Sequence, residues 1–212
     1  MDAVEQFKYK KLRISIFPDE DSQNPYKEWD NLSDTNFWLR GYDLDSAGKG
    51  QLGFDSPQEV VEAYERGEIV FYAPIYTYIH SGITISMEDR TYPFNDPWDS
   101  GLAGMVYVTK EKAAEEFPRY RGRMLWLACE RVARSEIQTL GMYLTNQVYG
   151  YGVSTKKGKE LDSCWGCYGL EYCIQQAKEA ADYCAQQRAA IKAQKKLAPF
   201  SESAQLLESN YA

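Results

Sequence analysis

Short stretches in which apolar residues alternate with polar ones recur along this 212-residue chain and constrain its fold more than any other feature. Between residues 7 and 17, Leu12, Ile14 and Ile16 alternate with polar neighbours, as in a strand that buries one face. Comparable stretches, several of them rich in β-branched and aromatic residues, lie at 69–79, 82–86, 104–109, 147–154 and 160–164. Because short loops join several of them, they predict a largely antiparallel sheet of five to seven strands.

Helical patterns lie between and after these strands. Ser56, Pro57 and Glu59 form a helix start, with serine as N-cap, proline at the first helical position and glutamate placed for a capping box. The segment 123–143 has the longest helical pattern in the middle of the chain. A last helix begins near residue 171 and carries one narrow stripe, made of Ile174, Ala177, Ala181, Cys184, Arg188 and Ile191. The chain is therefore expected to be an α+β protein with packed helices and a long C-terminal helix.

The domain organisation follows from these elements. We expect an α+β domain at 1–170, a C-terminal helix at 171–198 and a mobile tail at 199–212. The stripe on the C-terminal helix can dock on the sheet or pair with a second copy, which leaves an oligomer open. No stretch approaches the roughly 20 apolar residues that span a bilayer, and the N-terminus lacks the apolar core of a signal peptide. We therefore expect a cytoplasmic protein without membrane contact.

The net charge of −7 is unevenly distributed. Ile14–Asp99 holds 17 Asp and Glu against 5 Lys and Arg. A surface of that sign repels phosphate backbones and attracts basic protein surfaces, although acidity also simply keeps domains soluble. The sequence therefore favours binding to a protein partner over direct contact with nucleic acid. The acids assigned to this binding are Asp19, Glu20, Asp21, Glu28, Asp30, Asp43, Asp45 and Asp55.

Candidate catalytic groups are few. His80 is the only histidine, so nucleophilic catalysis would pair it with Ser100 or with Cys164. Cys164 and Cys167 form a C-x-x-C pair, which has the spacing of half a zinc site or of a redox pair. The chain has five cysteines, an odd number, and no phosphate-binding or dinucleotide-binding glycine motif. We therefore predict no metal, no cofactor and no disulfide framework. A non-enzymatic protein is favoured, with a small hydrolase or thiol-dependent enzyme as the alternative.

Arginines gather around the helical segment in the middle of the chain. They are Arg119, Arg121, Arg123, Arg131 and Arg134. A basic helix of this kind can hold nucleic acid, or it can neutralise the acidic half of the same protein. We favour neutralisation, and keep a nucleic-acid-binding accessory protein acting through Arg119–Arg134 as a further alternative.

Two polar blocks predict ordered turns. They comprise Trp98, Asp99, Ser100 and Gly101, and Asp162, Ser163, Trp165 and Gly166. In such turns Asp or Ser accepts backbone N–H groups and Gly supplies a positive φ, while the two tryptophans are expected to anchor the turns in the core.

These two blocks, together with 80–84, 104–108 and the Trp29–Leu32 segment, resemble a family of small proteins encoded by bacteriophages and mobile elements. The resemblance covers roughly 30–172 and implies a protein of the host bacterial cytoplasm without implying a particular chemistry. Combined with the acidic half, it predicts an inhibitor of a host defence protein, of the anti-CRISPR or anti-restriction type. Carboxylates on such an inhibitor would occupy positions where the target binds phosphates.

Overall fold

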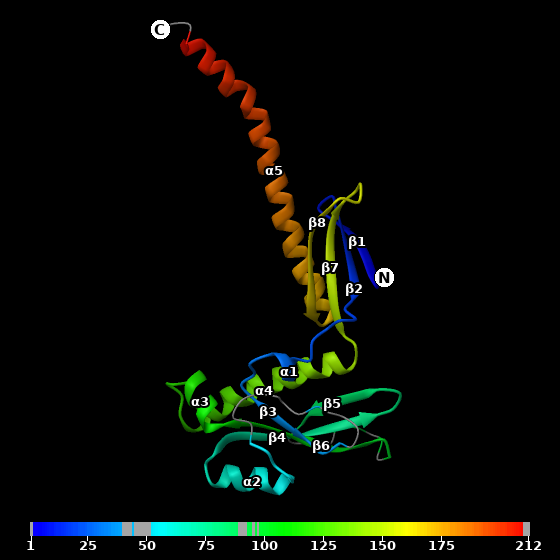
Figure 1. The fold of residues 1–212 in the computed structure, drawn as a ribbon, viewed down its shortest axis with the longest axis vertical. Coiled ribbons are helices and arrows are strands. Elements are labelled where there is room, and N and C mark those ends of the chain that lie inside the picture. Colours follow the sequence, from blue (N-terminus) through cyan, green and yellow to red (C-terminus); the bar gives the residue numbers. More distant parts are fainter. Residues whose placement is uncertain are drawn as a thin grey trace. The chain divides into compact units, whose positions relative to one another are not determined.

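The computed structural model describes residues 2–39, 44, 52–88, 93–94, 96 and 98–209, with side chains described up to residue 194. The chain forms two compact units. The terminal unit comprises Met1–Asp19 and Val148–Ala212, and the central unit comprises Glu20–Gln147. Each has one four-stranded antiparallel sheet (Figure 1), so the predicted α+β class with a long C-terminal helix is confirmed. The strands form two sheets, however, and not the single sheet that the alternation predicts.

In the terminal unit, distant parts of the chain meet in the strand order β1-β2-β7-β8. These strands are β1 (Glu5–Tyr9), β2 (Leu12–Pro18), β7 (Val148–Thr155) and β8 (Glu160–Tyr168). The central unit is thus inserted between the adjacent strands β2 and β7, which differs from the predicted domain at 1–170. The prediction of a single strand between residues 7 and 17 is wrong, because a turn at Lys10 and Lys11 divides this stretch into β1 and β2. The apolar pattern indicates β2, β7 and β8 but does not identify their partners, so the sequence could not indicate this pairing.

The predicted stripe on the C-terminal helix docks on the sheet of its own unit. Helix α5 (Leu170–Ser209) buries Cys173, Ala177 and Ala181 against β2 and β7. Small residues suit this contact because they let the helix approach the sheet closely. The helix continues past Pro199, so most of the predicted mobile tail at 199–212 is helical. Ala, Gln, Leu and Glu after the proline have high helix propensity.

The central unit has the strand order β3-β6-β4-β5. Its elements are α1 (Pro25–Glu28), β3 (Asp34–Phe37), α2 (Pro57–Glu65), β4 (Ile69–Ile79), β5 (Ile83–Met87), β6 (Ser100–Thr109), α3 (Lys110–Glu116) and α4 (Gly122–Leu144). The predicted start of α2 is confirmed, because the Ser56 hydroxyl accepts a hydrogen bond from the Glu59 N–H.

Helices cover both faces of the central sheet. Ala133, Ile137 and Leu140 of α4 pack with Val106 and Val108 on one face. Val60 and Ala63 of α2 pack with Met105 and Tyr107 on the other. Strand β6 is therefore buried on both sides over most of its length. Within the described part of the chain, no helix is long and apolar enough to cross a membrane.

Candidate functional site

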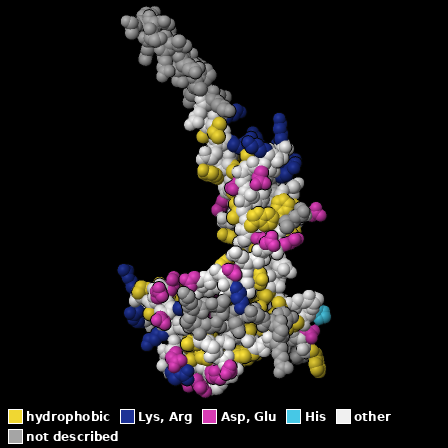
Figure 2. Space-filling view, in the orientation of Figure 1, with side chains coloured by type: hydrophobic (Ala, Val, Ile, Leu, Met, Phe, Trp, Pro, Cys, Tyr) yellow, Lys and Arg dark blue, Asp and Glu magenta, His cyan; other side chains and the backbone are white. Residues whose placement is uncertain are grey.

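The division into two units relocates the charge. The central unit holds 21 Asp and Glu against 12 Lys and Arg, a balance of −9, and the terminal unit holds 10 against 12, a balance of +2. The predicted acidic region therefore belongs almost entirely to the central unit. Figure 2 shows Asp and Glu side chains spread over that unit, with Lys and Arg gathered at one end of the terminal unit.

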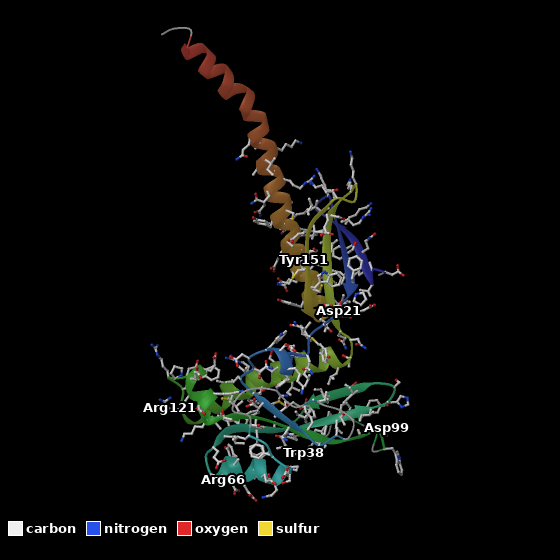
Figure 3. All side chains as sticks on the ribbon, viewed as in Figure 1. Asp21, Trp38, Arg66, Asp99, Arg121 and Tyr151 are labelled. Atoms are coloured by element: carbon white, nitrogen blue, oxygen red, sulfur yellow. The ribbon has the colours of Figure 1, made fainter. Side chains whose placement is uncertain are left out.

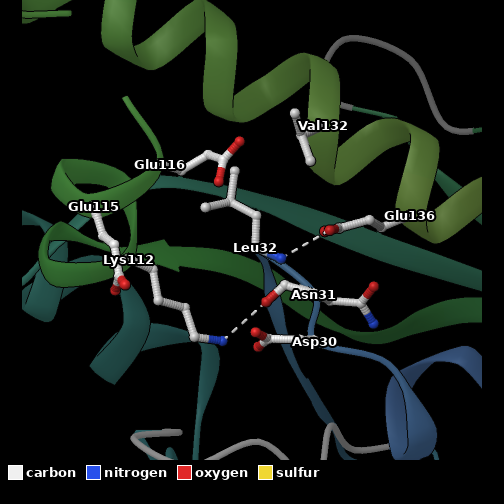
Figure 4. A pocket seen from close by; sticks show the side chains of 8 residues that line it. All are labelled: Asp30, Asn31, Leu32, Lys112, Glu115, Glu116, Val132 and Glu136. Carbon is white, nitrogen blue, oxygen red and sulfur yellow. Dashed lines mark hydrogen bonds between the residues drawn. The ribbon is translucent and has the colours of Figure 1, made fainter. Parts of the chain in front are cut away.

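A pocket of about 310 Å³ opens on the acidic central unit. Three segments line it: the loop that leads into β3, helix α3 and helix α4 (Figure 4). The lining residues are Asp30, Asn31, Leu32, Lys112, Glu115, Glu116, Val132 and Glu136. Four of these eight side chains are carboxylates and only one is a cation, so the local balance is strongly negative.

Glu136 fixes the wall of this pocket. Its carboxylate accepts hydrogen bonds from the Leu32 N–H at 2.8 Å, the Ser33 N–H at 3.0 Å and the Ser33 hydroxyl at 2.5 Å. The Ser33 and Tyr26 hydroxyls are hydrogen-bonded in turn, at 2.7 Å. Burial raises the pKa of Glu136, although the Ser33 and Leu32 donors oppose this effect. These contacts tie the loop before β3 to α4, so Glu136 serves the fold of the pocket.

Lys112, the one cation lining the pocket, is engaged by the protein itself. Its ammonium donates to the Asp34 carboxylate at 2.8 Å and to the Asn31 carbonyl at 3.2 Å. By contrast, among the described residues no Lys or Arg pairs with Asp30, Glu115 or Glu116. Three exposed carboxylates therefore line the same pocket as a lysine whose charge is already balanced. The pocket is suited to a cationic side chain of a partner.

The structure distributes the acids predicted to bind a partner. Glu20, Asp21, Glu28 and Asp30 are exposed on the central unit, and Glu28 and Asp30 lie in and just after α1. Asp55 is also exposed, directly before the Ser56 cap of α2. Asp43 and Asp45 lie outside the described residues. Only Asp30 of this set lines the pocket.

Asp19 differs from the others, because it belongs to the terminal unit and accepts a hydrogen bond from the Gly166 N–H at 2.9 Å. The sequence does not indicate Glu115 and Glu116 of α3 as residues of the pocket, because on sequence alone they belong to an ordinary solvated helix face.

The alternative catalytic residues receive different partners. The His80 Nδ1 lies 3.3 Å from an Asp99 carboxylate oxygen, and the histidine side chain is 69% exposed. The Ser100 hydroxyl donates to the Asp96 carbonyl. Cys164 lies on β8 of the terminal unit, whereas His80 lies in the central unit. Asp99, labelled in Figure 3, therefore orients an exposed histidine, while the Ser100 hydroxyl is directed to the backbone.

Two expectations about the polar blocks are wrong. Trp98 is 92% exposed and does not anchor a turn in the core. Ser100 and Gly101 belong to β6, and the block containing Asp162, Ser163, Trp165 and Gly166 belongs to β8. Asp96 supplies the turn instead, because its carboxylate accepts the N–H groups of Trp98 and Asp99.

The arginines around α4 also serve the fold in part. Arg134 donates to the Met87 carbonyl at 2.8 Å and pairs with Glu130 at 3.2 Å. Arg121 donates to the Pro118 and Tyr120 carbonyls at the start of α4. Arg119, Arg123 and Arg131 are exposed.

The cysteines are all free thiols, and they differ in exposure. Cys164 is exposed, whereas Cys167 and Cys173 are buried. Burial raises the pKa of Cys167 and Cys173, and raises that of Cys129 to about 11. Among the described residues, no group of three or more His, Cys, Asp and Glu could hold a metal ion.

We expect iodoacetamide to alkylate Cys164 first in the folded protein near pH 8. A raised pKa leaves less of the reactive thiolate at this pH. Cys129, Cys167 and Cys173 should therefore react only as the pH rises further or the protein unfolds. Peptide mass spectrometry over time measures the order. Equal rates at Cys164 and Cys167 would contradict the buried position of Cys167, and the urea-unfolded chain is the control for intrinsic reactivity.

No protein-family model, curated protein or solved structure matches this chain. The resemblance of its sequence blocks to phage and mobile-element proteins therefore stays a prediction.

Proposed function

We propose that this chain is a non-enzymatic binding protein whose central unit engages a basic protein surface through the acidic pocket. The observation that supports it is the pocket that Asp30, Glu115 and Glu116 line together with Lys112, whose charge Asp34 already balances. Carboxylates held in a concave site offer a partner's Arg or Lys both charge and hydrogen-bond acceptors. The excess acid of the whole unit would also speed encounter with such a partner.

The class of partner follows from the same chemistry. A protein that handles nucleic acid presents a basic groove, and clustered carboxylates can occupy it in place of phosphates. Together with the resemblance to phage and mobile-element proteins, this leads us to propose a host defence protein as the target, such as a CRISPR effector or a restriction enzyme. The proposed place of action is the host bacterial cytoplasm.

Charge reversal at the pocket tests this function. We expect the triple variant Asp30→Lys, Glu115→Lys, Glu116→Lys to weaken binding to the captured target at least about tenfold, because buried or partly buried charge pairs across interfaces contribute about this much. The target would be captured from bacterial lysate, purified, and titrated against wild type and variant. Wild type, but not the triple variant, should also compete with the target's nucleic acid.

The matched control is Glu62→Lys with Glu65→Lys on α2, which changes charge on the same unit away from the pocket. Long-range steering predicts only a modest loss for this control, and that loss should disappear in high salt. If the α2 variant weakens binding as much as the pocket variant, the pocket is not the site. If neither weakens binding, the acidic mechanism is wrong.

A further inference from the structure

The sheet of the terminal unit has one covered and one open face. Helix α5 packs on the face that carries Ile14, Ile16 and Val153. Among the described residues of this unit, no other helix or strand lies over the opposite face. Strand alternation and register assign Lys8, Arg13, Phe17, Gly150 and Trp165 to the open face, together with the carboxylate of Glu160, which pairs with Ser154.

Two aromatic rings lie side by side at one end of this open face. The ring centroids of Phe17 and Trp165 are 6.1 Å apart, and the ring planes differ by 31°. The indole lies directly on the backbone of Gly150, where an added Cβ would come within 2.2 Å of a ring atom. Trp165 is nevertheless 49% exposed. Its inner face thus rests on the sheet while much of the side chain remains accessible.

An irregularity in β8 holds the indole in this position. Tyr149 pairs with Cys167 and Tyr151 with Cys164, so Trp165 and Gly166 together oppose the single residue between the tyrosines. Gly166 has φ +75°, and the Asp19 carboxylate accepts its N–H at 2.9 Å. Such a bulge redirects a side chain relative to the regular strand.

Lysines gather at the other end of the same sheet. Both hairpin turns lie there, because Leu12 of β2 pairs with Thr155 of β7. The exposed lysines of the two turns include Lys11, Lys156, Lys157 and Lys159, and Figure 2 shows basic side chains over this end. Lys8 and Arg13 are paired opposite each other on the open face, between the turns and the aromatic rings. Positive charge therefore continues from the turns onto the face.

The turn between β1 and β2 holds two lysines in a backbone conformation that lysine seldom adopts. Lys10 and Lys11 have φ of 44° and 68°, a geometry that Asn-Gly adopts most readily in two-residue hairpin loops. Lys10 is held by Asp182, with 2.8 Å between ammonium and carboxylate, whereas Lys11 is exposed. Residues in unfavourable backbone regions commonly lie at functional sites.

We propose that this open face binds single-stranded nucleic acid, with the phosphate backbone along the lysines and bases stacked on Trp165 and Phe17. Aromatic side chains on an open antiparallel sheet, combined with a basic track, provide the stacking and the charge that unpaired strands require. The rings and the hairpin turns are five residues apart along β2, roughly 17 Å, which suits a strand of several nucleotides. The site belongs to the terminal unit, whereas the arginines around α4 belong to the central unit.

Fluorescence anisotropy with the full chain tests this proposal. The probes are labelled oligo(dT) and oligo(U) of about 16 nucleotides and a duplex of equal length, at salt concentrations between about 50 and 200 mM. We expect binding of a single strand that weakens steeply with salt, and weaker binding of the duplex. Comparing the two oligonucleotides distinguishes DNA from RNA. Absence of single-strand binding at the lowest salt, or equal binding of the duplex, would overturn the proposal.

Variants assign the contacts. Lys11→Gln, Lys156→Gln, Lys157→Gln and Lys159→Gln together should weaken binding at least about tenfold and flatten its salt dependence. Trp165→Leu should weaken it at least about fivefold, and Trp165→Phe should retain most of the affinity, because a ring remains. Trp98→Leu, at an exposed tryptophan of the other unit, is the control. Thermal unfolding of each variant verifies that it is folded.

Ultraviolet crosslinking of the wild-type protein gives a second measurement that does not depend on variant stability. Crosslinked peptides should map to 11–18 and 160–168. Crosslinks confined to 119–134, or a loss of binding in the variant with Arg119, Arg121 and Arg123 all changed to Gln but not in the lysine variant, would place the site on α4 and overturn the proposal. The proposal would also be overturned if the protein bound vesicles of acidic lipids as tightly as it binds single strands, and if Trp165→Leu left that vesicle binding unchanged.

Discussion

Replacing Gly104 with alanine should destabilise the central unit by about 3 kcal/mol, the upper end of the usual cost of overpacking a buried site. Gly104 of β6 pairs with Phe37 of β3. An added Cβ would lie 2.3 Å from the Asn36 carbonyl oxygen and 3.0 Å from the Phe37 Cα. Both neighbours are backbone atoms, so no side-chain rotation can relieve the clash and β3 itself must move.

Movement of β3 carries a further cost. All four residues of β3 are buried, and the Asn36 side chain donates to the Phe54 carbonyl and accepts from the Phe54 N–H. Shifting the strand lengthens both hydrogen bonds in a place where water cannot replace them.

Hydrogen-exchange mass spectrometry on the full chain measures this loss for the central unit alone. Peptides from β3 and β6 should exchange about 100-fold faster in Gly104→Ala, while those from β2 and β7 remain unchanged. Gly101→Ala is the matched control, because it lies on the same strand and nothing comes within 4 Å of an added Cβ. Equal effects of the two substitutions would show that the close approach of β3 to Gly104 does not cause the loss of stability.

The local structure of this chain follows closely from its residues. Apolar alternation at Ile69–Ile79 became a strand whose buried residues alternate, and Ser56 became the cap of α2. In both places the relevant contacts are made within one element or between immediate neighbours, where period and capping chemistry are decisive.

Long-range structure did not follow in the same way. The pairing of β2 with β7 joins residues more than 130 positions apart, and the alternation of Ile14 and Ile16 is compatible with many partners. Trp98 and Trp165 both belong to short polar blocks, yet Trp165 lies against Gly150 of the adjacent strand, whereas Trp98 is 92% exposed. Burial depends on what lies opposite, which a single sequence does not contain.

The candidate site shows the same limit. Asp30 could be selected because it belongs to an acidic region, but Glu115 and Glu116 line the pocket through the position of α3. The neutralisation of Lys112 by Asp34 joins residues that are 78 positions apart. The sequence therefore indicates that the site is negatively charged, whereas the geometry of the site depends on tertiary packing.

Replacing Lys112 with methionine should destabilise the central unit by about 3 kcal/mol, because it removes the ion-pair partner of a carboxylate that stays buried. The Asp34 side chain is 1% exposed and the Lys112 side chain 23%, so water can reach the lysine but hardly the carboxylate. Methionine preserves most of the length and apolar contact of the lysine stem. The loss should therefore come mainly from the carboxylate left behind in the protein interior.

The double variant Asp34→Asn, Lys112→Met separates this cause from a general effect of altering α3. With the carboxylate removed as well, at least half of the lost stability should return, as measured by the free energy of unfolding in urea and by hydrogen exchange in the central unit. Losses that simply add would contradict the role of the pair.

Under the proposed function, Lys112→Met leaves Asp30, Glu115 and Glu116 in place and removes a nearby cation. Under conditions in which this variant stays folded, it should bind the basic partner at least as tightly as wild type does. A substitution at a residue that lines the pocket would then lower the stability of the protein without lowering its affinity for the partner.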